Sequence, residues 1–408
     1  MQCRFCHNHI SHVFVDLGMS PPSNSFVKPE NAYSVEANYP LKVFVCEKCF
    51  LVQLPEHKSA KEIFTDEYVY FSSYSKSWLE HSKKYVDLVS KDFGLNSESS
   101  VIEIASNDGY LLQYFKEKNI HVLGIEPTAN TAEVAQSKGI ETRVDFFGVS
   151  LARELAASNR FADLILGNNV LAHVPDINDF VGGLRLLLKP DGIVTMEFPH
   201  LYQLVLNNQF DTIYHEHFSY LSLFTVAAIF EGHDMTIFKV DELSTHGGSI
   251  RIYAKITSCE KWTRHESVER VMQMELAAGV NSLQYYYGFQ ERTQLVNDQL
   301  ITFLNQAKAE HKKVVGYGAA AKGNTLLNYC GIKSDLIDFV VDASPHKQGT
   351  LLPGSHIPVV SEEQITNVKP DFIIILPWNI QSEIIKQLDY AKEWGCKFVV
   401  PIPQLQII

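Results

Sequence analysis

The sequence predicts an α/β protein with a small cysteine-rich N-terminal module followed by two Rossmann-like α/β domains. Two C-x-x-C pairs stand near the N-terminus, and two stretches, starting at Val101 and Val314, alternate short apolar runs with helical patterns. Such alternation is typical of sheets that are covered by helices on both faces. With 408 residues the chain is too long for one ordinary domain, so these three regions are expected to fold as separate units.

Composition and charge describe a soluble globular protein and exclude several classes of partner. Hydrophobic residues make up 46% of the chain and charged residues 20%, which supplies a sizeable core. The net charge of −12 argues against a general binder of nucleic acid or of anionic membranes. No apolar run approaches the ~20 residues of a membrane span, and no signal-peptide pattern follows Met1. We therefore expect a cytoplasmic protein with reduced cysteines.

The cysteine pairs have the spacing of a structural zinc site. The four cysteines are Cys3, Cys6, Cys46 and Cys49. Four thiolates complete the tetrahedral shell of Zn²⁺, so the ion is expected to stabilise a module that cannot build its own core. His7 and His9 are close enough to be alternative ligands, but four cysteines leave no vacancy. Unligated thiols or disulfides are the competing interpretation.

Residues 68–75 form an aromatic and hydroxyl-rich run that leads into a helical pattern at 78–88. Two interpretations stand side by side here. The run is either an ordinary loop that enters a helix or a lid whose tyrosines cover a ligand. Tyr70 is its candidate catalytic residue.

The first α/β domain contains seven predicted strands, with helices between most of them. The strands cover residues 101–105, 122–126, 142–145, 164–167, 193–198, 236–240 and 250–255. This is the doubly wound pattern, in which ligands bind at the carboxyl ends of the strands. The last two strands have no full helix between them, so we expect them to form an antiparallel hairpin at one edge.

Polar residues at these strand ends predict S-adenosylmethionine as a ligand. The first strand carries Glu103 and runs into a loop with Ser106 and Asn107, not the G-x-G-x-x-G loop of a dinucleotide site. Glu126 ends the second strand and can hold both ribose hydroxyls, although an acidic residue there is often only a helix cap. An amino acid joined to a ribose fits these groups, which favours a class I methyltransferase domain. The predicted donor-binding residues are Glu103, Ala105, Ser106, Asn107, Gly109, Glu126, Pro127 and Asn168.

Residues 210–220 carry a dense group of side chains that can hold or move a proton. They are Asp211, Tyr214, His215, Glu216, His217 and Tyr220. The segment follows the fifth predicted strand, so it is expected at the same edge, where a base can act beside the methyl donor. A polar surface loop is the competing interpretation. A metal site at His215 and His217 is disfavoured, because no third ligand follows shortly downstream.

The second half of the chain begins with a predicted helix over residues 262–311 and continues into a second α/β unit. Gly316, Gly318 and Ala321 fit a dinucleotide fingerprint, with Asp342 at the end of the next strand. The competing interpretations are a tight turn without a ligand and a diphosphate at the helix N-terminus with Lys322 as its counter-charge. Further strands are predicted at 339–341, 372–376 and 397–401.

Five runs together resemble the zinc-containing sugar C-methyltransferases that build branched deoxysugars on nucleotide carriers. The runs are 102–112, 197–200, 210–220, 245–249 and 316–324. The four cysteines also match the N-terminal zinc domain of that family, and the resemblance covers essentially the whole chain. It implies a zinc module and lid at 1–75, a methyltransferase domain at 76–258, and a helical bridge with a Rossmann-like domain at 259–408.

The resemblance also implies the reaction and the roles of individual residues. It implies methylation of a carbon next to a ketone, commonly C-3 of a 4-keto sugar, with His217 as general base. Tyr214 and Glu216 would lie beside that base, and Asn169 and His173 match supporting polar positions. The candidate substrate-binding residues are His246, Lys322, Gly323, Asn324 and Lys347. Apart from a nucleotide-sugar substrate, we predict no nucleic-acid or membrane partner.

Two other functions are kept as alternatives. A nicotinamide-dependent nucleotide-sugar oxidoreductase would use the fingerprint at Gly316, although Lys322 prefers an anion and the first domain has no such loop. A non-catalytic, zinc-stapled binding protein would tolerate replacement of His217.

Overall fold

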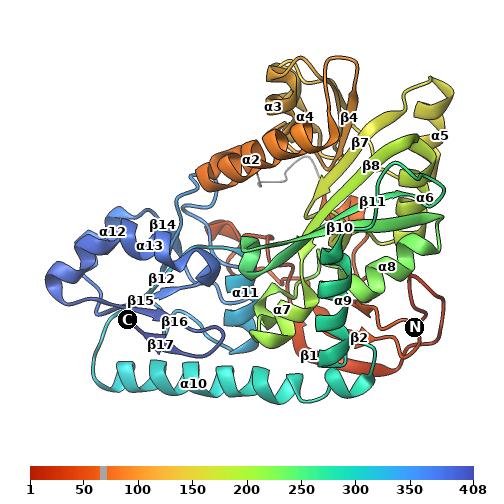
Figure 1. Cartoon of the computed structure of the whole chain (residues 1–408). Helices are drawn as coiled ribbons and strands as arrows, with labels where there is room; N and C mark the ends of the chain where they lie inside the picture. Colours follow the sequence, from red (N-terminus) through yellow and green to blue (C-terminus); the bar gives the residue numbers. More distant parts are fainter. Residues whose placement is uncertain (65–70) are drawn as a thin grey trace.

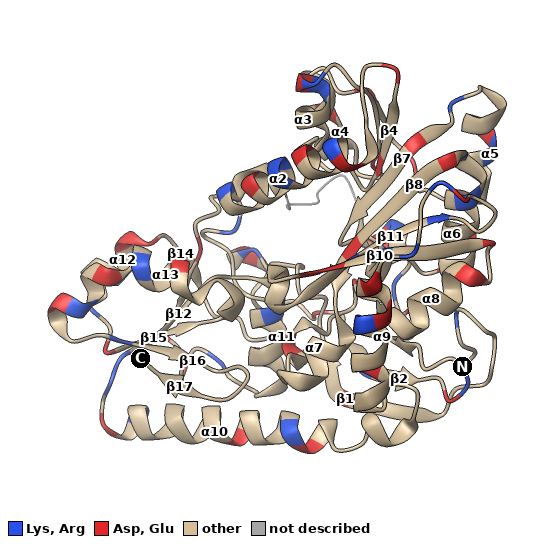
Figure 2. Ribbon diagram, viewed as in Figure 1, with Lys and Arg blue, Asp and Glu red and all other residues tan. Residues whose placement is uncertain are grey.

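The computed structural model describes residues 1–64 and 71–408, so the candidate Tyr70 lies outside the described residues (Figure 1). Three sheets organise the described chain, one of four strands, one of seven and one of six. None of the helices in the described part is long and apolar enough to cross a membrane. In Figure 2, acidic and basic residues are intermixed along α2 (Lys76–Phe93) and α10 (Phe289–Ala309), the pattern of solvated helix faces.

The N-terminal sheet is completed by a strand from the middle of the chain. Its order is β1 (His12–Ser20), β2 (Tyr39–Val45), β3 (Val52–Gln53) and β9 (Ser219–Tyr220), and a short helix α1 (Ala60–Ile63) follows β3. In the register of β3 against β9, Val52 pairs with Tyr220. Because β9 directly follows residues 210–218, the N-terminal module is joined by backbone hydrogen bonds to the segment that holds the predicted base.

The seven-stranded sheet has the predicted doubly wound pattern. Its order is β10 (Met235–Leu243), β11 (Ser249–Ile256), β8 (Leu188–Pro199), β7 (Ala162–Asn168), β4 (Ser100–Ile104), β5 (His121–Ile125) and β6 (Thr142–Arg143). Strands β4 to β8 are parallel, whereas β11 runs antiparallel to both β8 and β10, which confirms the predicted hairpin. The helices of this domain are α2, α3 (Leu112–Glu117), α4 (Ala129–Ser137), α5 (Val149–Ala157), α6 (Ile177–Leu187), α7 (Leu201–Leu206) and α8 (Leu223–Glu231).

The C-terminal sheet is parallel except for its last strand. Its order is β14 (Val359–Val360), β13 (Val340–Val341), β12 (Val314–Tyr317), β15 (Phe372–Ile375), β16 (Lys397–Val400) and β17 (Gln406–Ile407). The helices around it are α11 (Ala321–Tyr329), α12 (Glu363–Val368) and α13 (Gln381–Gln387). The predicted single helix over 262–311 is wrong, because the structure has α9 (Glu266–Ala278) and then α10. Gly279 caps α9 with φ of 92° and Gly288 precedes α10 with φ of 79°, conformations that break a helix and suit glycine.

The N-terminal module has no hydrophobic core of its own. Phe14 and Val43 of β1 and β2 belong to one cluster with Phe289 and the C-terminal sheet, whereas Cys3 and Cys46 belong to the cluster of the seven-stranded sheet. The module therefore packs between the two α/β domains. Its place brings its loops to the carboxyl edge of β7 and β8.

Candidate active site

The four predicted zinc ligands lie together. The Sγ atoms of Cys3, Cys6, Cys46 and Cys49 are all within 4.8 Å of one another, with 3.5 Å between Cys3 and Cys49. A tetrahedron with Zn–S bonds of about 2.3 Å has edges of about 3.8 Å, so the thiolates fit this ion. Both pairs use the same turn: the N–H groups of His7 and Phe50 donate to the carbonyls of Cys3 and Cys46, and both residues have φ of 58°. His7 therefore has a structural position in this turn that needs no bond to a metal ion.

The loop after β4 is a tight turn with polar side chains. Ala105, Asn107 and Gly109 have positive φ angles of 56°, 48° and 74°. A side chain at Gly109 would come within 2.5 Å of Ile140 Cδ1, which explains the glycine by packing. Ser106 is fully buried and its Oγ has no hydrogen-bond partner, so this loop offers an unsatisfied polar atom beside the strand ends.

Two buried carboxyl groups flank that loop. Burial raises the pKa of Glu103 well above its usual range, and the hydroxyl of Tyr110 opposes this shift. Glu126 accepts hydrogen bonds from the N–H groups of Asn107, at 2.8 Å, and Thr128, at 3.0 Å, so it orders the two turns beside it without capping α4. Pro127 follows it in the turn toward α4. A ribose hydroxyl would have to exchange with these bonds, and the contact of Glu126 with the donor stays a prediction.

The described part of the 68–75 run lies against this loop. The N–H of Ser72 donates to Asn107 Oδ1 at 2.9 Å, and the N–H of Ser73 donates to Asp108 Oδ2 at 3.3 Å. Lys138 also contacts the described part of this run, because its Nζ donates a hydrogen bond to Ser73 Oγ at 3.0 Å. The side chain of Tyr74 is 67% exposed, so this tyrosine covers no ligand here. The backbone of the run, not Tyr74, contacts the donor loop.

The carboxyl end of β7 presents several polar atoms that lack partners. Asn168 Nδ2, Asn169 Oδ1 and His173 Nδ1 are buried and make no hydrogen bond. Asn169 Nδ2 lies 2.9 Å from Nε2 of His246, which places two predicted residues from different regions side by side. Because unpaired buried polar atoms are costly, this group is the strongest sign of a ligand site in the domain.

His217 has the tautomer that a general base needs. Its Nδ1–H donates to the carbonyl of Thr212 at 2.8 Å, and since a carbonyl only accepts, Nε2 carries the lone pair of the neutral ring. Burial, together with the nearby His173, lowers the pKa of His217 well below its usual range. The ring is therefore neutral near pH 7 and ready to accept a proton.

The predicted neighbours of His217 surround it. The ring centroids of Tyr214 and His173 lie 4.0 and 4.6 Å from that of His217. Burial raises the pKa of Glu216 to about 7, and Asn24 of the N-terminal module donates to its Oε1 at 2.5 Å. The sequence did not predict a role for Asn24, because a lone asparagine in a Pro- and Asn-rich loop has no distinguishing pattern.

His215, two residues earlier, contacts a different set of residues. Its ring packs 5.9 Å from Tyr39 and 6.4 Å from His57, both in the N-terminal module. In the part of the chain that the structure describes, the only cluster of His, Cys, Asp or Glu that could hold a metal ion is the four cysteines.

Lys322 reaches the same site from the start of α11. Its Nζ donates to Asn379 Oδ1 at 2.7 Å and lies 4.7 Å from the ring centroid of Trp378. Burial lowers the pKa of Lys322, and its charge in turn lowers the pKa values of His217 and His246. The C-terminal domain thus contributes a partly buried cation whose charge acts on the predicted base.

Comparison with known proteins identifies the family. Family models match along the chain: a zinc binding domain at residues 3–64, a methyltransferase domain at 77–240 and a C-methyltransferase C-terminal domain at 244–403. The chain is 36% identical over 407 residues to the C-methyltransferase NovU of Streptomyces niveus, covering 100% of this chain and 96% of that relative. The chain belongs to this C-methyltransferase family.

More distant relatives match only parts of this C-methyltransferase. The ubiquinone biosynthesis O-methyltransferase of Rhodopseudomonas palustris (strain HaA2) is 27% identical over 97 residues, 24% of this chain and 38% of that relative. The crystal structure of the PH0226 protein from Pyrococcus horikoshii OT3 matches with 15% identity and a TM-score of 0.39, covering 48% of this chain and 100% of that one. These likenesses are too distant to bear on the reaction.

The family assignment confirms the predicted cofactors. The protein is an S-adenosylmethionine-dependent C-methyltransferase, and its N-terminal cysteines form the zinc site of the family. When bound, the methyl donor supplies an electrophilic methyl group. The polar atoms around Ser106 and Asn168 fit an amino-acid and ribose ligand, and the residue assignments themselves stay predictions.

The remaining predicted substrate residues of the C-methyltransferase have contacts within the protein. A side chain at Gly323 would come within 2.9 Å of Leu376, so this glycine lets α11 approach β15. Asn324 Nδ2 donates to the carbonyl of Ser23 at 2.6 Å, which ties α11 to the N-terminal module. Lys347 Nζ donates to the carbonyl of Ala319 at 2.9 Å. Within this set, the charge of Lys322 acts on both His217 and His246, and Asn324 Oδ1 is buried without a hydrogen-bond partner.

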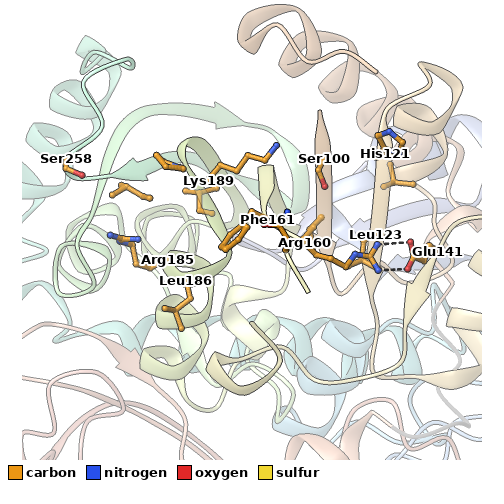
Figure 3. A pocket seen from close by; sticks show the side chains of 16 residues that line it. Ser100, His121, Leu123, Glu141, Arg160, Phe161, Arg185, Leu186, Lys189 and Ser258 are labelled. Atoms are coloured by element: carbon orange, nitrogen blue, oxygen red, sulfur yellow. Dashed lines mark hydrogen bonds and ion pairs between the residues drawn. The ribbon is translucent and has the colours of Figure 1, made fainter. Parts of the chain in front are cut away.

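A cavity of about 890 Å³ opens at the opposite edge of the methyltransferase sheet (Figure 3). Ser100, His121 and Leu188, the first residues of β4, β5 and β8, line it. It therefore lies at the amino ends of the strands. It is remote from His217, and Arg160 in its wall is already paired with Glu141 at 2.6 Å.

Proposed function

We propose that this C-methyltransferase acts on a nucleotide-linked keto-deoxysugar and methylates the carbon next to the ketone, C-3 of a 4-keto sugar. The observation that carries the proposal is the bond from His217 Nδ1–H to the carbonyl of Thr212, which leaves Nε2 as the acceptor in a buried site. A carbon beside a ketone loses a proton because the product is an enolate, so a neutral imidazole is a suitable base.

In the proposed reaction, His217 Nε2 takes the proton and the ketone becomes an enolate. Asn169 and Tyr214 are the candidate groups that orient or stabilise the enolate oxygen. The electron pair of the C–H bond would then form the new C–C bond to the donor's methyl group, while the methyl–sulfur bond breaks and its electron pair stays on sulfur, which leaves as a neutral thioether. Glu216 lies next to the base and is held by Asn24, so it is placed to accept or return a proton near neutral pH.

The nucleotide part of the substrate is assigned to the C-terminal domain. Lys322 is a partly buried cation whose hydrogen-bond partner is the neutral Asn379. Burial lowers its pKa, the charge of Asp211 opposes this shift, and a diphosphate would supply further opposite charge. In this scheme residues 1–75 hold zinc and the lid, 76–258 bind the methyl donor, and 259–408 bind the nucleotide. The packing of Gly318 disfavours an oxidoreductase, because a side chain there would come within 2.5 Å of Pro377, which explains this glycine without a dinucleotide.

The decisive experiment screens keto-sugar nucleotides with S-adenosylmethionine and detects the product by mass. A gain of one methyl on a 4-keto sugar, located at C-3 by NMR, is the expected result. His217→Asn is the control, because it keeps the size of the side chain and cannot accept the proton. Methylation of oxygen or nitrogen in place of carbon, or equal turnover by His217→Asn, would overturn the proposal.

A further inference from the structure

Asp211 is a buried carboxylate that no part of the proposed reaction uses. Its side chain is fully buried, Oδ2 accepts a hydrogen bond from Nε1 of Trp378 at 2.7 Å, and Oδ1 has no hydrogen-bond partner. Burial raises the pKa of Asp211 to about 6, against the opposing effect of Lys322. A carboxyl group at such a place is costly, so its position calls for a role.

Asp211 stands one residue before the carbonyl that fixes the tautomer of His217. The backbone carbonyl of Thr212 accepts from His217 Nδ1–H at 2.8 Å, so any rotation of this peptide redirects Nε2. The same short 3-10 turn, Phe210–Thr212, contacts α11, whose Thr325 Oγ1 donates to the carbonyl of Ile213 at 2.9 Å. Two side chains of the C-terminal domain therefore hold the residues on either side of Thr212, Trp378 through the carboxylate of Asp211 and Thr325 through the carbonyl of Ile213.

Trp378 links this turn to the cation of the same domain. Its indole N–H binds Asp211 while the ring lies 4.7 Å from Lys322 Nζ. The ring is also closely packed, because a side chain at Gly247 would come within 2.3 Å of it. The side chain of Trp378 thus contacts the 210–212 turn whose carbonyl binds His217, the candidate anion site at Lys322, and the 245–247 turn that carries His246.

We propose that Asp211 and Trp378 are a positioning pair, which holds the Thr212 carbonyl so that His217 presents Nε2 to the substrate carbon. The inference rests on the proposed function, since it takes His217 as the base. It assigns the C-terminal domain a part in the proton transfer besides its part in binding. A misplacement of about 1 Å at a reacting group can cost about 100-fold in rate, so loss of this bond should be visible in the chemical step.

The test uses Trp378→Phe, which removes the N–H and keeps an aromatic ring near Lys322, although it loses the outer indole atoms that pack against Gly247. We expect kcat to fall roughly ten- to a hundredfold. Without a productive donor, the rate at which the proton beside the ketone exchanges for solvent deuterium should fall by the same factor. The KM for the nucleotide-sugar should change little. Asp211→Leu should reproduce this result, and the double variant should be no worse than either single variant, because both remove one bond.

Matched controls separate positioning from simple docking of the domain. Thr325→Val removes the neighbouring interdomain bond to Ile213 and should lower kcat less than Trp378→Phe, at a comparable loss of melting temperature. Asp211→Asn keeps an oxygen for the indole and should lose less than Asp211→Leu. Equal effects of Trp378→Phe and Thr325→Val, or a change in KM alone, would overturn the inference.

The outcome also distinguishes this inference from the proposed function. If His217→Asn abolishes the exchange and Trp378→Phe leaves it unchanged, only the positioning pair is refuted. If His217→Asn exchanges the proton at the normal rate, the base assignment itself is refuted. The experiment uses the full chain with its zinc, and melting temperatures of all variants are measured beside the native protein.

Discussion

The two α/β domains of this C-methyltransferase differ in the signals that their turns carry. The first has no dinucleotide fingerprint, yet Ser106 Oγ, Asn168 Nδ2 and His173 Nδ1 are buried there without partners. The second has the fingerprint, yet a side chain at Gly318 would come within 2.5 Å of Pro377, and the carboxylate of Asp342 is already bonded. Glycine spacing reports a tight turn, whereas unsatisfied buried polar atoms report a missing ligand.

The comparison also shows how the second domain contributes without a dinucleotide. Its turn places Lys322 beside His217 and His246, whose pKa values the cation lowers. In the proposed scheme, one domain supplies the donor-binding groups and the base, and the other supplies a charge. The predictions below test this division, beginning with the largest expected effect.

Replacement of the base should have the largest effect. His217→Asn should lower the rate of methylation by roughly 10² to 10⁴, because the variant cannot accept the proton. Calorimetry should show that the donor and the nucleotide-sugar still bind, since the substitution changes neither binding site. A loss of donor affinity that accounts for the whole defect would show that His217 binds the donor and is not the base.

The pH dependence should separate His217 from Glu216. A base must be neutral if it is His, and the pKa of His217 is lowered, so the acid limb of kcat/KM should lie well below pH 6.5. The pKa of Glu216 is raised to about 7, so activity that depended on its ionised form would fall as the pH drops through about 7. Rates measured between pH 5 and 9, with the fold monitored at each pH, decide between them.

Replacement of Glu126, the acidic residue that follows β5, should have the next largest effect. Glu126→Ala should weaken S-adenosylmethionine about ten- to a hundredfold, because the ribose and the Asn107 turn both lose an acceptor. Glu126→Gln keeps one acceptor oxygen and should lose less. Calorimetry showing native affinity for Glu126→Ala would remove this residue from the donor site and leave it as a residue that orders the two neighbouring turns.

Loss of the cation should have a smaller and selective effect. Lys322→Ala should raise the KM for the nucleotide-sugar by about tenfold, since a charge-assisted contact of about 1.5 kcal/mol is lost. Affinity for the donor should not change, because the donor groups belong to the other domain. A parallel loss of donor affinity would break the division between the two domains.

The smallest effect is expected for Asp342, the acidic residue that a dinucleotide site would use to bind ribose. Asp342→Asn should lower the free energy of unfolding by about 1 kcal/mol, because it weakens the contacts with Ala319 and Lys347. Methylation should stay close to native. Fluorescence titration of the native protein should show no micromolar binding of NADH, and such binding would restore the dinucleotide interpretation of Gly316 and Gly318.

Much of the fold follows from patterns that are local in the sequence. Alternating apolar runs predicted the seven strands of the methyltransferase sheet and β12, β13, β15 and β16 of the C-terminal sheet, but not the two-residue strands β14 and β17. The two C-x-x-C pairs predicted the thiolate cluster. The order of strands placed residues 210–220 at the ligand edge. In each case the spacing of neighbouring residues is itself the physical cause, because it sets which face is apolar and where ligands converge.

The tertiary structure decided what those residues contact. Asn24 reaches Glu216 across 192 positions of the sequence, and Trp378 reaches Asp211 across 167, so no periodic pattern connects them. The glycines of the dinucleotide fingerprint are a second example, because the sequence alone fits either a bound cofactor or a tight turn. The tertiary structure distinguishes the two, because it places Pro377 against Gly318 and bonds Asp342 to Ala319. Local spacing sets the backbone of each element, whereas the packing of three domains around one site determines which polar atoms are already paired and which remain for a ligand.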